Sequence, residues 1–128
     1  MEKEIITTSK APKPVGPYSQ AVKVGNLIFV SGQIPLDPRT GTPVSGDIKE
    51  QTKRVLENIK GILEAEGLTL DTVVKTTVFM RNMADFSKMN DVYATYFKNK
   101  PPARTTIQAG DLPAKMDIEI DAIALKSE

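Results

Sequence analysis

The sequence predicts a single α+β domain whose mixed sheet carries two helices on one face. Its 128 residues suit one domain with one core. Apolar residues recur every three or four positions in two segments, and short stretches rich in β-branched residues lie around them. The resulting order of strands, helix, strand, helix and strands favours a sheet that helices cover on one side. All nine prolines lie outside residues 44–100, where regular elements can therefore run longest.

Two strands are expected near the N-terminus, at residues 18–24 and 27–34. They flank the dipeptide Gly25-Asn26, which is typical of a short hairpin turn. Gly32 interrupts the second strand, and glycine weakens a strand unless the backbone bulges or another group comes close. The pair Ser31-Gly32 is therefore either a plain bulge or a place where backbone amides face a ligand.

The two helices are expected at residues 47–67 and at about residues 85–98. In the first, Asp47 can cap the N-terminus and Glu50 follows as in a capping box, while Gly67 suits the C-terminal stop. Its apolar side chains recur at helical spacing and are Ile48, Val55, Leu56, Ile59, Ile62 and Leu63. The second helix has an equivalent stripe, formed by Phe86, Met89, Tyr93, Tyr96 and Phe97.

Three further strands are expected at residues 73–80, 104–109 and 116–125. The last has one apolar face, formed by Met116, Ile118, Ile120 and Ala122. Its other face is mixed and consists of Asp117, Glu119, Asp121, Ile123 and Leu125. Because two helices can cover only one side of the sheet, we expect another subunit to cover the other side. The alternative is that these are ordinary exposed apolar side chains.

The composition excludes several classes of chemistry. The chain has neither histidine nor cysteine, so a Ser-His triad, a cysteine nucleophile and a thiolate or imidazole metal site are excluded, and no metal is expected. With 17 basic and 16 acidic residues, the charge lacks the footprint of a dedicated nucleic-acid binder. Apolar runs are too short for a membrane helix. The N-terminus lacks the features of a secretion signal, so a cytoplasmic location is expected.

Arg104 and Glu119 are the strongest candidates for chemistry. Arg104 begins an uncharged strand segment, where a guanidinium could hold a carboxylate through two parallel hydrogen bonds. Alternatively, it could form a structural salt bridge with Glu119 or Asp121. Glu119 lies in mid-strand, where a carboxylate could orient or deprotonate a water molecule. The equal alternative is a polar, water-filled interior that Glu119 shares with Asp117 and Asp121.

Two further polar residues stand at positions that could serve an interface. Asn90 interrupts the apolar stripe of the second helix, and Tyr18 opens a strand directly after Gly16-Pro17. Either side chain could be a polar handle at an interface, and either could be purely structural.

Six segments that together cover most of the chain carry a family resemblance. They are GPYSQAV (residues 16–22), SGQIPLDPRTG (31–41), QTKRVLENIKGILEAEG (51–67), VVKTTVFMRNMADFSKMNDVYATYF (73–97), PPARTTI (101–107) and IEIDAIA (118–124). In these segments the sequence resembles the Rid family, also called YjgF-like, and within it the RidA branch.

The resemblance implies one Rid-family domain over residues 1–128, with a chorismate-mutase-like α+β fold that assembles as a homotrimer with sites between subunits. It further implies a 2-iminobutanoate/2-iminopropanoate deaminase. Such an enzyme hydrolyses the reactive imino and enamino acids released by pyridoxal-phosphate-dependent serine and threonine dehydratases to 2-oxo acids and ammonium. No cofactor is implied.

The resemblance also assigns roles to individual positions. The carboxylate-binding arginine of the family matches Arg104, its water-holding glutamate matches Glu119, and its N-terminal tyrosine matches Tyr18. Other positions that line the cleft match Ser31, Gly32, Asn90 and Thr106. Many members have cysteine at the position of Thr106, and a second glutamate is common at the position of Asp121.

Two other functions remain open at this point. The first is a non-enzymatic binder of 2-oxo acids that acts as a metabolic sensor. The second is RNA cleavage or translation inhibition, which is known for some relatives under the perchloric-acid-soluble name. The near-neutral charge and the lack of an aromatic RNA-stacking motif count against the second function.

Overall fold

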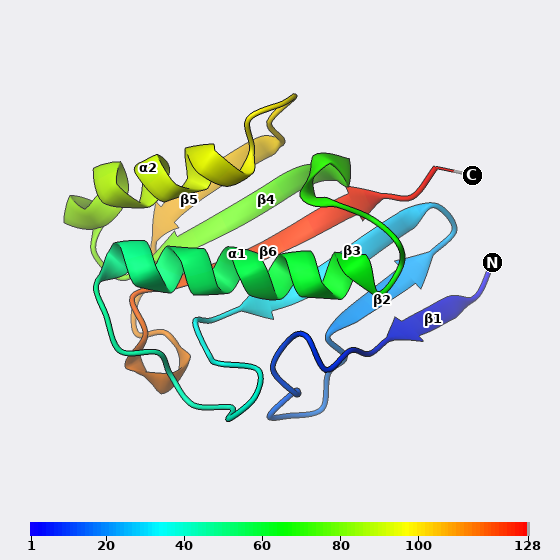
Figure 1. Ribbon diagram of the computed structural model, residues 1–128, viewed down its shortest axis with the longest axis horizontal. Coiled ribbons are helices and arrows are strands. Elements are labelled where there is room, and N and C mark those ends of the chain that lie inside the picture. Colours follow the sequence, from blue (N-terminus) through cyan, green and yellow to red (C-terminus); the bar gives the residue numbers. More distant parts are fainter. Residues whose placement is uncertain (128) are drawn as a thin grey trace.

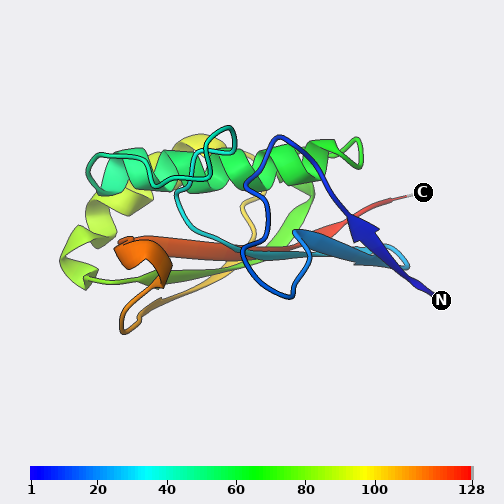
Figure 2. The same ribbon diagram turned by 90° about the horizontal axis from the view of Figure 1, so that it is seen from below.

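The computed structural model describes residues 1–127, which form one mixed sheet with two α-helices on one face (Figures 1 and 2). Its elements are β1 (Lys3–Ile6), β2 (Ala21–Val24), β3 (Leu27–Gln33), α1 (Ile48–Glu64), β4 (Val73–Met80), α2 (Phe86–Tyr96), β5 (Ala103–Gln108) and β6 (Ile118–Leu125). The strand order is β1-β2-β3-β6-β4-β5. β5 pairs with β4 in parallel, and the other neighbours are antiparallel. The predicted α+β class is confirmed.

Local sequence signals set the bounds of α1. Asp47 caps the helix, because its Oδ1 accepts hydrogen bonds of 3.1 Å from the backbone N–H groups of both Lys49 and Glu50. The helix ends at Glu64, and Gly67 follows with a φ of +72°. This left-handed conformation favours glycine and turns the chain away from the helix axis. The predicted cap and stop are confirmed.

Two N-terminal features differ from the expectation. The strand expected from residue 18 begins only at Ala21, because the buried side chain of Gln20 joins an irregular segment. Its Nε2 donates to the carbonyl oxygens of Ala11 and Pro12 at 3.2 and 2.9 Å. In addition, β1 was not predicted; this short strand pairs with β2 at the edge of the sheet.

The other bounds deviate less. The strand expected from residue 116 begins at Ile118, because Asp117 is held by Gln51 of α1. The second helix is shorter than expected and spans Phe86–Tyr96. The expectations for β3 and β5 are each off by one residue at their ends, whereas β4 has the predicted bounds.

The core lies between the helices and one face of the sheet. Alternation along β6 directs Ile118 and Ile120 toward α1, and both side chains are fully buried. The side chains of α1 that meet the sheet are also fully buried; they include Val55, Leu56, Ile59, Ile62 and Leu63. Each such side chain contributes roughly 1.5–3 kcal/mol through burial. The helical stripe and the strand alternation thus create one shared core.

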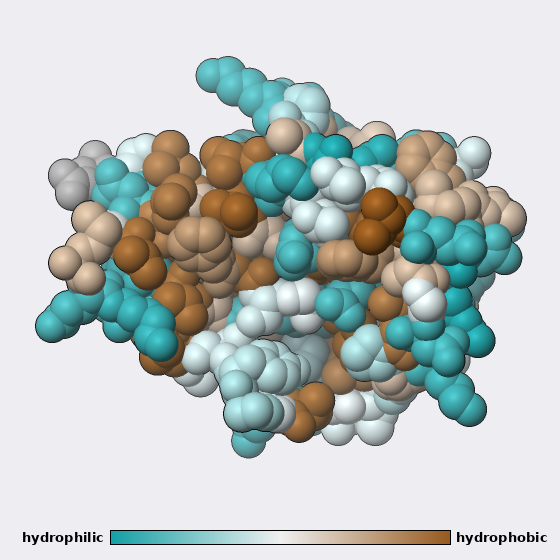
Figure 3. All heavy atoms as spheres, turned by 180° about the vertical axis from the view of Figure 1, so that it is seen from behind, coloured by the Kyte–Doolittle hydropathy of each residue, from teal (hydrophilic) through white to brown (hydrophobic). Residues whose placement is uncertain are grey.

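The opposite face of the sheet is open and partly apolar. It is the face seen in Figure 3, where apolar residues gather over part of the surface. Four of its large side chains are between 40% and 44% exposed, and they are Leu27, Phe29, Ile107 and Leu125. The prediction that two helices leave one side of the sheet uncovered is therefore confirmed.

Within residues 1–127, neither helix has both the length and the apolar character needed to cross a membrane.

Candidate functional site

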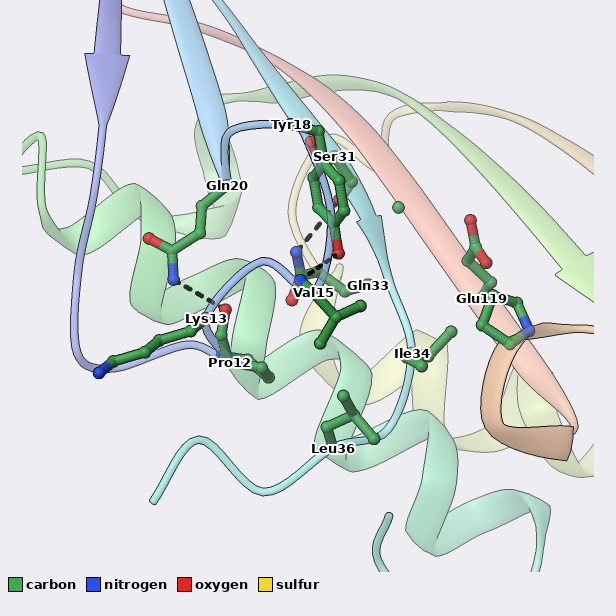
Figure 4. Close-up of a pocket in the computed structure, with 12 residues that line it drawn as sticks. Pro12, Lys13, Val15, Tyr18, Gln20, Ser31, Gln33, Ile34, Leu36 and Glu119 are labelled. Carbon is green, nitrogen blue, oxygen red and sulfur yellow. Dashed lines mark hydrogen bonds between the residues drawn. The ribbon is translucent and has the colours of Figure 1, made fainter. Parts of the chain in front are cut away.

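A pocket of about 400 Å³ lies beside the irregular part of β3. One wall is apolar and includes Val15, Ile34 and Leu36, and the other side includes Glu119 of β6 (Figure 4). Tyr18, Ser31 and Gly32 also line it. Four residues of the predicted site therefore meet here: Tyr18, Ser31, Gly32 and Glu119. We call this group the glutamate pocket.

Gly32 allows Glu119 to occupy this position. The pairing of β3 with β6 shifts register between Val30 and Gln33, which makes residues 31–32 a bulge. A Cβ atom added to Gly32 would collide with Glu119 Oε2 and lie 2.9 Å from its Cδ. The bulge expected at this glycine is therefore confirmed, and the Glu119 carboxylate approaches it closely.

The environment of Glu119 favours its neutral form. Burial raises the pKa of the Glu119 carboxyl above its ordinary value, and the nearby charge of Asp121 raises this pKa further. The three carboxylates of this segment are not gathered in one polar interior. Asp117 Oδ2 accepts from Gln51 Nε2 at 2.8 Å, and Asp121 Oδ1 accepts from the backbone N–H of Thr77 at 3.1 Å. Glu119 is the one that lines the pocket.

Ser31 and Tyr18 shape the pocket through contacts to the chain itself. The Ser31 N–H donates to the Gln20 carbonyl oxygen at 3.0 Å, and its hydroxyl donates to the Ser19 carbonyl oxygen at 2.5 Å. Both donors are engaged, so the expected pair of ligand-facing amides is reduced to Gly32. The Tyr18 ring is half exposed, and its hydroxyl accepts from the Val15 N–H at 3.4 Å.

Arg104 lies apart from the glutamate pocket, on the helix-covered face of the sheet. It pairs in register with the buried Thr76 of β4, and β4 separates its strand from β6. Its Nη1 donates to Asn90 Oδ1 at 2.8 Å. The interpretation of Arg104 as a salt-bridge partner of Glu119 or Asp121 is therefore wrong, because those carboxylates lie on another strand and the opposite face.

Thr106 lies two residues beyond Arg104 on the same face of β5. Its Oγ1 is buried and has no hydrogen-bond partner among residues 1–127. Within the same described residues, only Nη1 of Arg104 donates a hydrogen bond, so the Nε and Nη2 donors are available. We call Asn90, Arg104 and Thr106 the arginine cluster. One chain thus holds the predicted site as two separate groups.

Two aromatic residues beside Arg104, Phe86 and Tyr93, were not predicted to belong to a functional site. The guanidinium carbon of Arg104 lies 5.5 Å from the ring centroid of Phe86 and 4.8 Å from that of Tyr93. Both distances fall within the range of cation–π contacts. The sequence placed these rings in the apolar stripe of the second helix, and only the presence of Asn90 in that stripe indicated a polar neighbour.

Comparisons with known proteins agree with this architecture. The model of the endoribonuclease L-PSP family matches residues 8–126. A RutC family protein of Pyrococcus abyssi is 60% identical over 98% of this chain and 99% of its own. A mouse protein named 2-iminobutanoate/2-iminopropanoate deaminase is 45% identical over 97% of this chain and 92% of its own.

Solved structures give the same result. A Thermotoga maritima protein superposes with a TM-score of 0.95 at 54% identity and covers 100% of both chains. The Escherichia coli protein TdcF, determined with bound serine, has a TM-score of 0.93 at 40% identity and covers 97% of this chain and 99% of its own. The chain belongs to the endoribonuclease L-PSP family, which is the Rid or YjgF-like family that its segments resemble.

Proposed function

We propose that this protein hydrolyses reactive 2-imino acids, the products of pyridoxal-phosphate-dependent serine and threonine dehydratases, to 2-oxo acids and ammonium. We further propose that it does so as a homotrimer with sites between subunits. The names of its deaminase relatives support the reaction class. The serine bound to TdcF supports a small ligand of the size of a 2-imino acid, because serine also carries a carboxylate next to a carbon that bears nitrogen.

The separation of Arg104 from Glu119 is the observation that carries the proposal. The arginine cluster and the glutamate pocket lie on opposite faces of one sheet, so a single chain cannot direct both groups at one small molecule. A second copy can supply the missing half. The exposed apolar side chains of the open face favour such packing, because their burial between copies would stabilise the assembly.

The two groups provide complementary chemistry for this reaction. The free Nε and Nη2 edge of Arg104 suits a bidentate bond to the substrate carboxylate. Glu119 of the neighbouring copy, whose pKa is raised by burial, is suited to exchange a proton with a water molecule. Water adds to the imine carbon and gives a carbinolamine. This intermediate forms the carbonyl group of the 2-oxo acid as it releases ammonia, which is protonated to ammonium.

The direct test couples a threonine dehydratase to the protein and follows the decay of the imine. Arg104→Ala should lower kcat/KM by about 10²- to 10⁴-fold, as expected for losing two charge-assisted hydrogen bonds of roughly 1.5–3 kcal/mol each. Glu119→Ala should lower it by about 10²- to 10⁴-fold. Arg39→Ala is the matched control, since Arg39 is exposed and pairs only with Asp37 among the described residues. Full activity in both site variants would refute the assignment.

A mixing experiment tests the location of the site between subunits. Arg104→Ala and Glu119→Ala subunits are unfolded together, refolded at equal amounts, and assayed. If each site takes its arginine and its glutamate from different chains, about a quarter of the sites will be intact after random assembly. Activity no higher than that of the separate variants would contradict shared sites.

Tight binding of 2-oxobutanoate without turnover would favour a 2-oxo acid sensor instead.

RNA cleavage, which the family name suggests, has less support in this chain. The 17 basic and 16 acidic residues nearly cancel. Affinity for nucleic acid depends on clustered cations that neutralise phosphates, and Lys13 is the single cation among the described residues that line the glutamate pocket.

A further inference from the structure

Two contacts, one at the hydroxyl and one at the side of the ring, hold Tyr93 in place. Its hydroxyl shares a 2.7 Å hydrogen bond with Thr76 Oγ1, and both residues are buried. The ring centroid of Phe97 lies 4.6 Å away at an interplanar angle of 39°. A hydrogen bond at the tip and an aromatic contact at the side leave this ring little freedom to move.

The fixed ring supports the Arg104 guanidinium. The guanidinium carbon lies 4.8 Å from the Tyr93 centroid, closer than its 5.5 Å to the Phe86 centroid. Thr76, which anchors the Tyr93 hydroxyl, is also the in-register neighbour of Arg104 on β4. The position of the ring and that of the arginine backbone therefore depend on the same residue.

The contacts of Arg104 leave one edge of the guanidinium unused. Asn90 accepts from Nη1, and the two rings contact the flat guanidinium group, which leaves Nε and Nη2 as the donors without a partner among residues 1–127. Burial raises the pKa of the Tyr93 hydroxyl, so the ring stays neutral and attracts the cation through its π-face. An arginine held in this way loses less freedom on binding a carboxylate.

We propose that Tyr93 is a positioning residue, which together with Thr76 holds Arg104 so that its Nε and Nη2 edge is presented to the substrate carboxylate. This inference rests on the proposed function, because it assigns the carboxylate to Arg104. It adds that recognition depends on a buried tyrosine that touches no substrate itself.

The experiment measures 2-oxobutanoate binding by calorimetry and imine hydrolysis by the coupled assay. Tyr93→Leu should weaken 2-oxobutanoate binding and raise KM by about tenfold, the effect expected for losing a partly desolvated cation–π contact. The pH profile of kcat, which reports on Glu119, should keep its shape. Tyr96→Leu is the matched control: Tyr96 is on the same helix, but its hydroxyl donates to Glu57. This control should bind 2-oxobutanoate as the wild type does.

A double-mutant cycle distinguishes positioning from a general structural effect. If Tyr93 acts through Arg104, Tyr93→Leu will weaken binding in the wild-type background and will add nothing in Arg104→Ala. The same loss in both backgrounds would overturn the proposal. Thr76→Val and Tyr93→Phe keep the core volume while removing the anchoring hydrogen bond. They should weaken binding two- to threefold, which tests the proposal even if Tyr93→Leu does not fold.

The outcomes also separate this proposal from the proposed function. A wild-type protein that neither binds 2-oxobutanoate nor hydrolyses the imine would overturn the proposed function and the role of Tyr93 with it. A wild type that does both, alongside folded Tyr93 and Thr76 variants with unchanged KM and unchanged affinity, would overturn the role of Tyr93 alone.

Discussion

Replacing Gly32 with alanine should disable the glutamate pocket while leaving the fold intact. The added Cβ would lie 2.9 Å from Glu119 Cδ and 3.2 Å from its Cγ, whereas ordinary contacts begin at 3.4 Å. The carboxyl carbon must therefore retreat, and Oε2, which is closer still, must move farther, by about 1 Å. A displacement of this size at a reacting group costs roughly 100-fold in rate, or about 2.7 kcal/mol of transition-state stabilisation.

The assay is the dehydratase-coupled decay of the imine, with urea unfolding as the measure of stability. Gly110→Ala is the matched control, because a Cβ at Gly110 meets nothing within 4 Å. It should keep full activity. The double variant Gly32→Ala/Glu119→Ala should be no slower than Glu119→Ala alone, because both changes remove the same carboxylate from the pocket.

A folded Gly32→Ala protein that keeps wild-type kcat/KM would refute this prediction. That result would mean either that the position of the Glu119 carboxylate is unimportant or that the bulge adapts to the added methyl group. A loss of unfolding free energy well above 1 kcal/mol would also contradict it, because a half-buried glutamate should be able to move outward at little cost.

Two further predictions concern the surroundings of Glu119. Burial raises the pKa of Glu119 above its ordinary 4.5, so the ionised carboxylate destabilises the folded state. In acid, Glu119→Gln should therefore be as stable as the wild type. As pH rises through the raised pKa, the wild type should lose stability and Glu119→Gln should become the more stable protein. Urea unfolding over that pH range tests this, and a constant difference would contradict it. Gln51→Leu should cost about 2–3 kcal/mol of unfolding free energy by leaving the N–H and carboxylate of Asp117 without the Gln51 amide. Gln51→Leu should also lower activity, because it loosens the start of the strand that carries Glu119. Urea unfolding that is unchanged from the wild type would argue against this role of the Gln51 amide.

Much of the fold could be predicted because its local signals are strong. Asp47, the apolar stripe and Gly67 define α1, and the β-branched segment 73–80 is observed with its predicted bounds. The strand β1 was missed because four residues of mixed character at a sheet edge carry little periodicity. Residues 18–20 were assigned to a strand because sequence alone does not show that Gln20 binds the carbonyl oxygens of Ala11 and Pro12 in the preceding loop.

The site could be predicted residue by residue but not assembled. Ile118 and Ile120 place Glu119 on the outer face of β6, since alternation leaves no other choice. No such signal exists for Arg104. Its strand has polar residues on both faces, so alternation does not show which face Arg104 occupies. Its distance from Glu119 depends on the strand order, in which β4 separates β5 from β6, and that order arises from long-range pairing.

If the proposed homotrimer forms, the two-layer design makes folding and association separate events with separate free energies. The core between the helices and the inner face is complete within one chain, whereas Leu27, Phe29 and Leu125 on the outer face add little to it. Dilution should therefore dissociate any assembly into chains that are still folded. The proposed catalysis would then depend on protein concentration through mass action, while the fold of each chain persists.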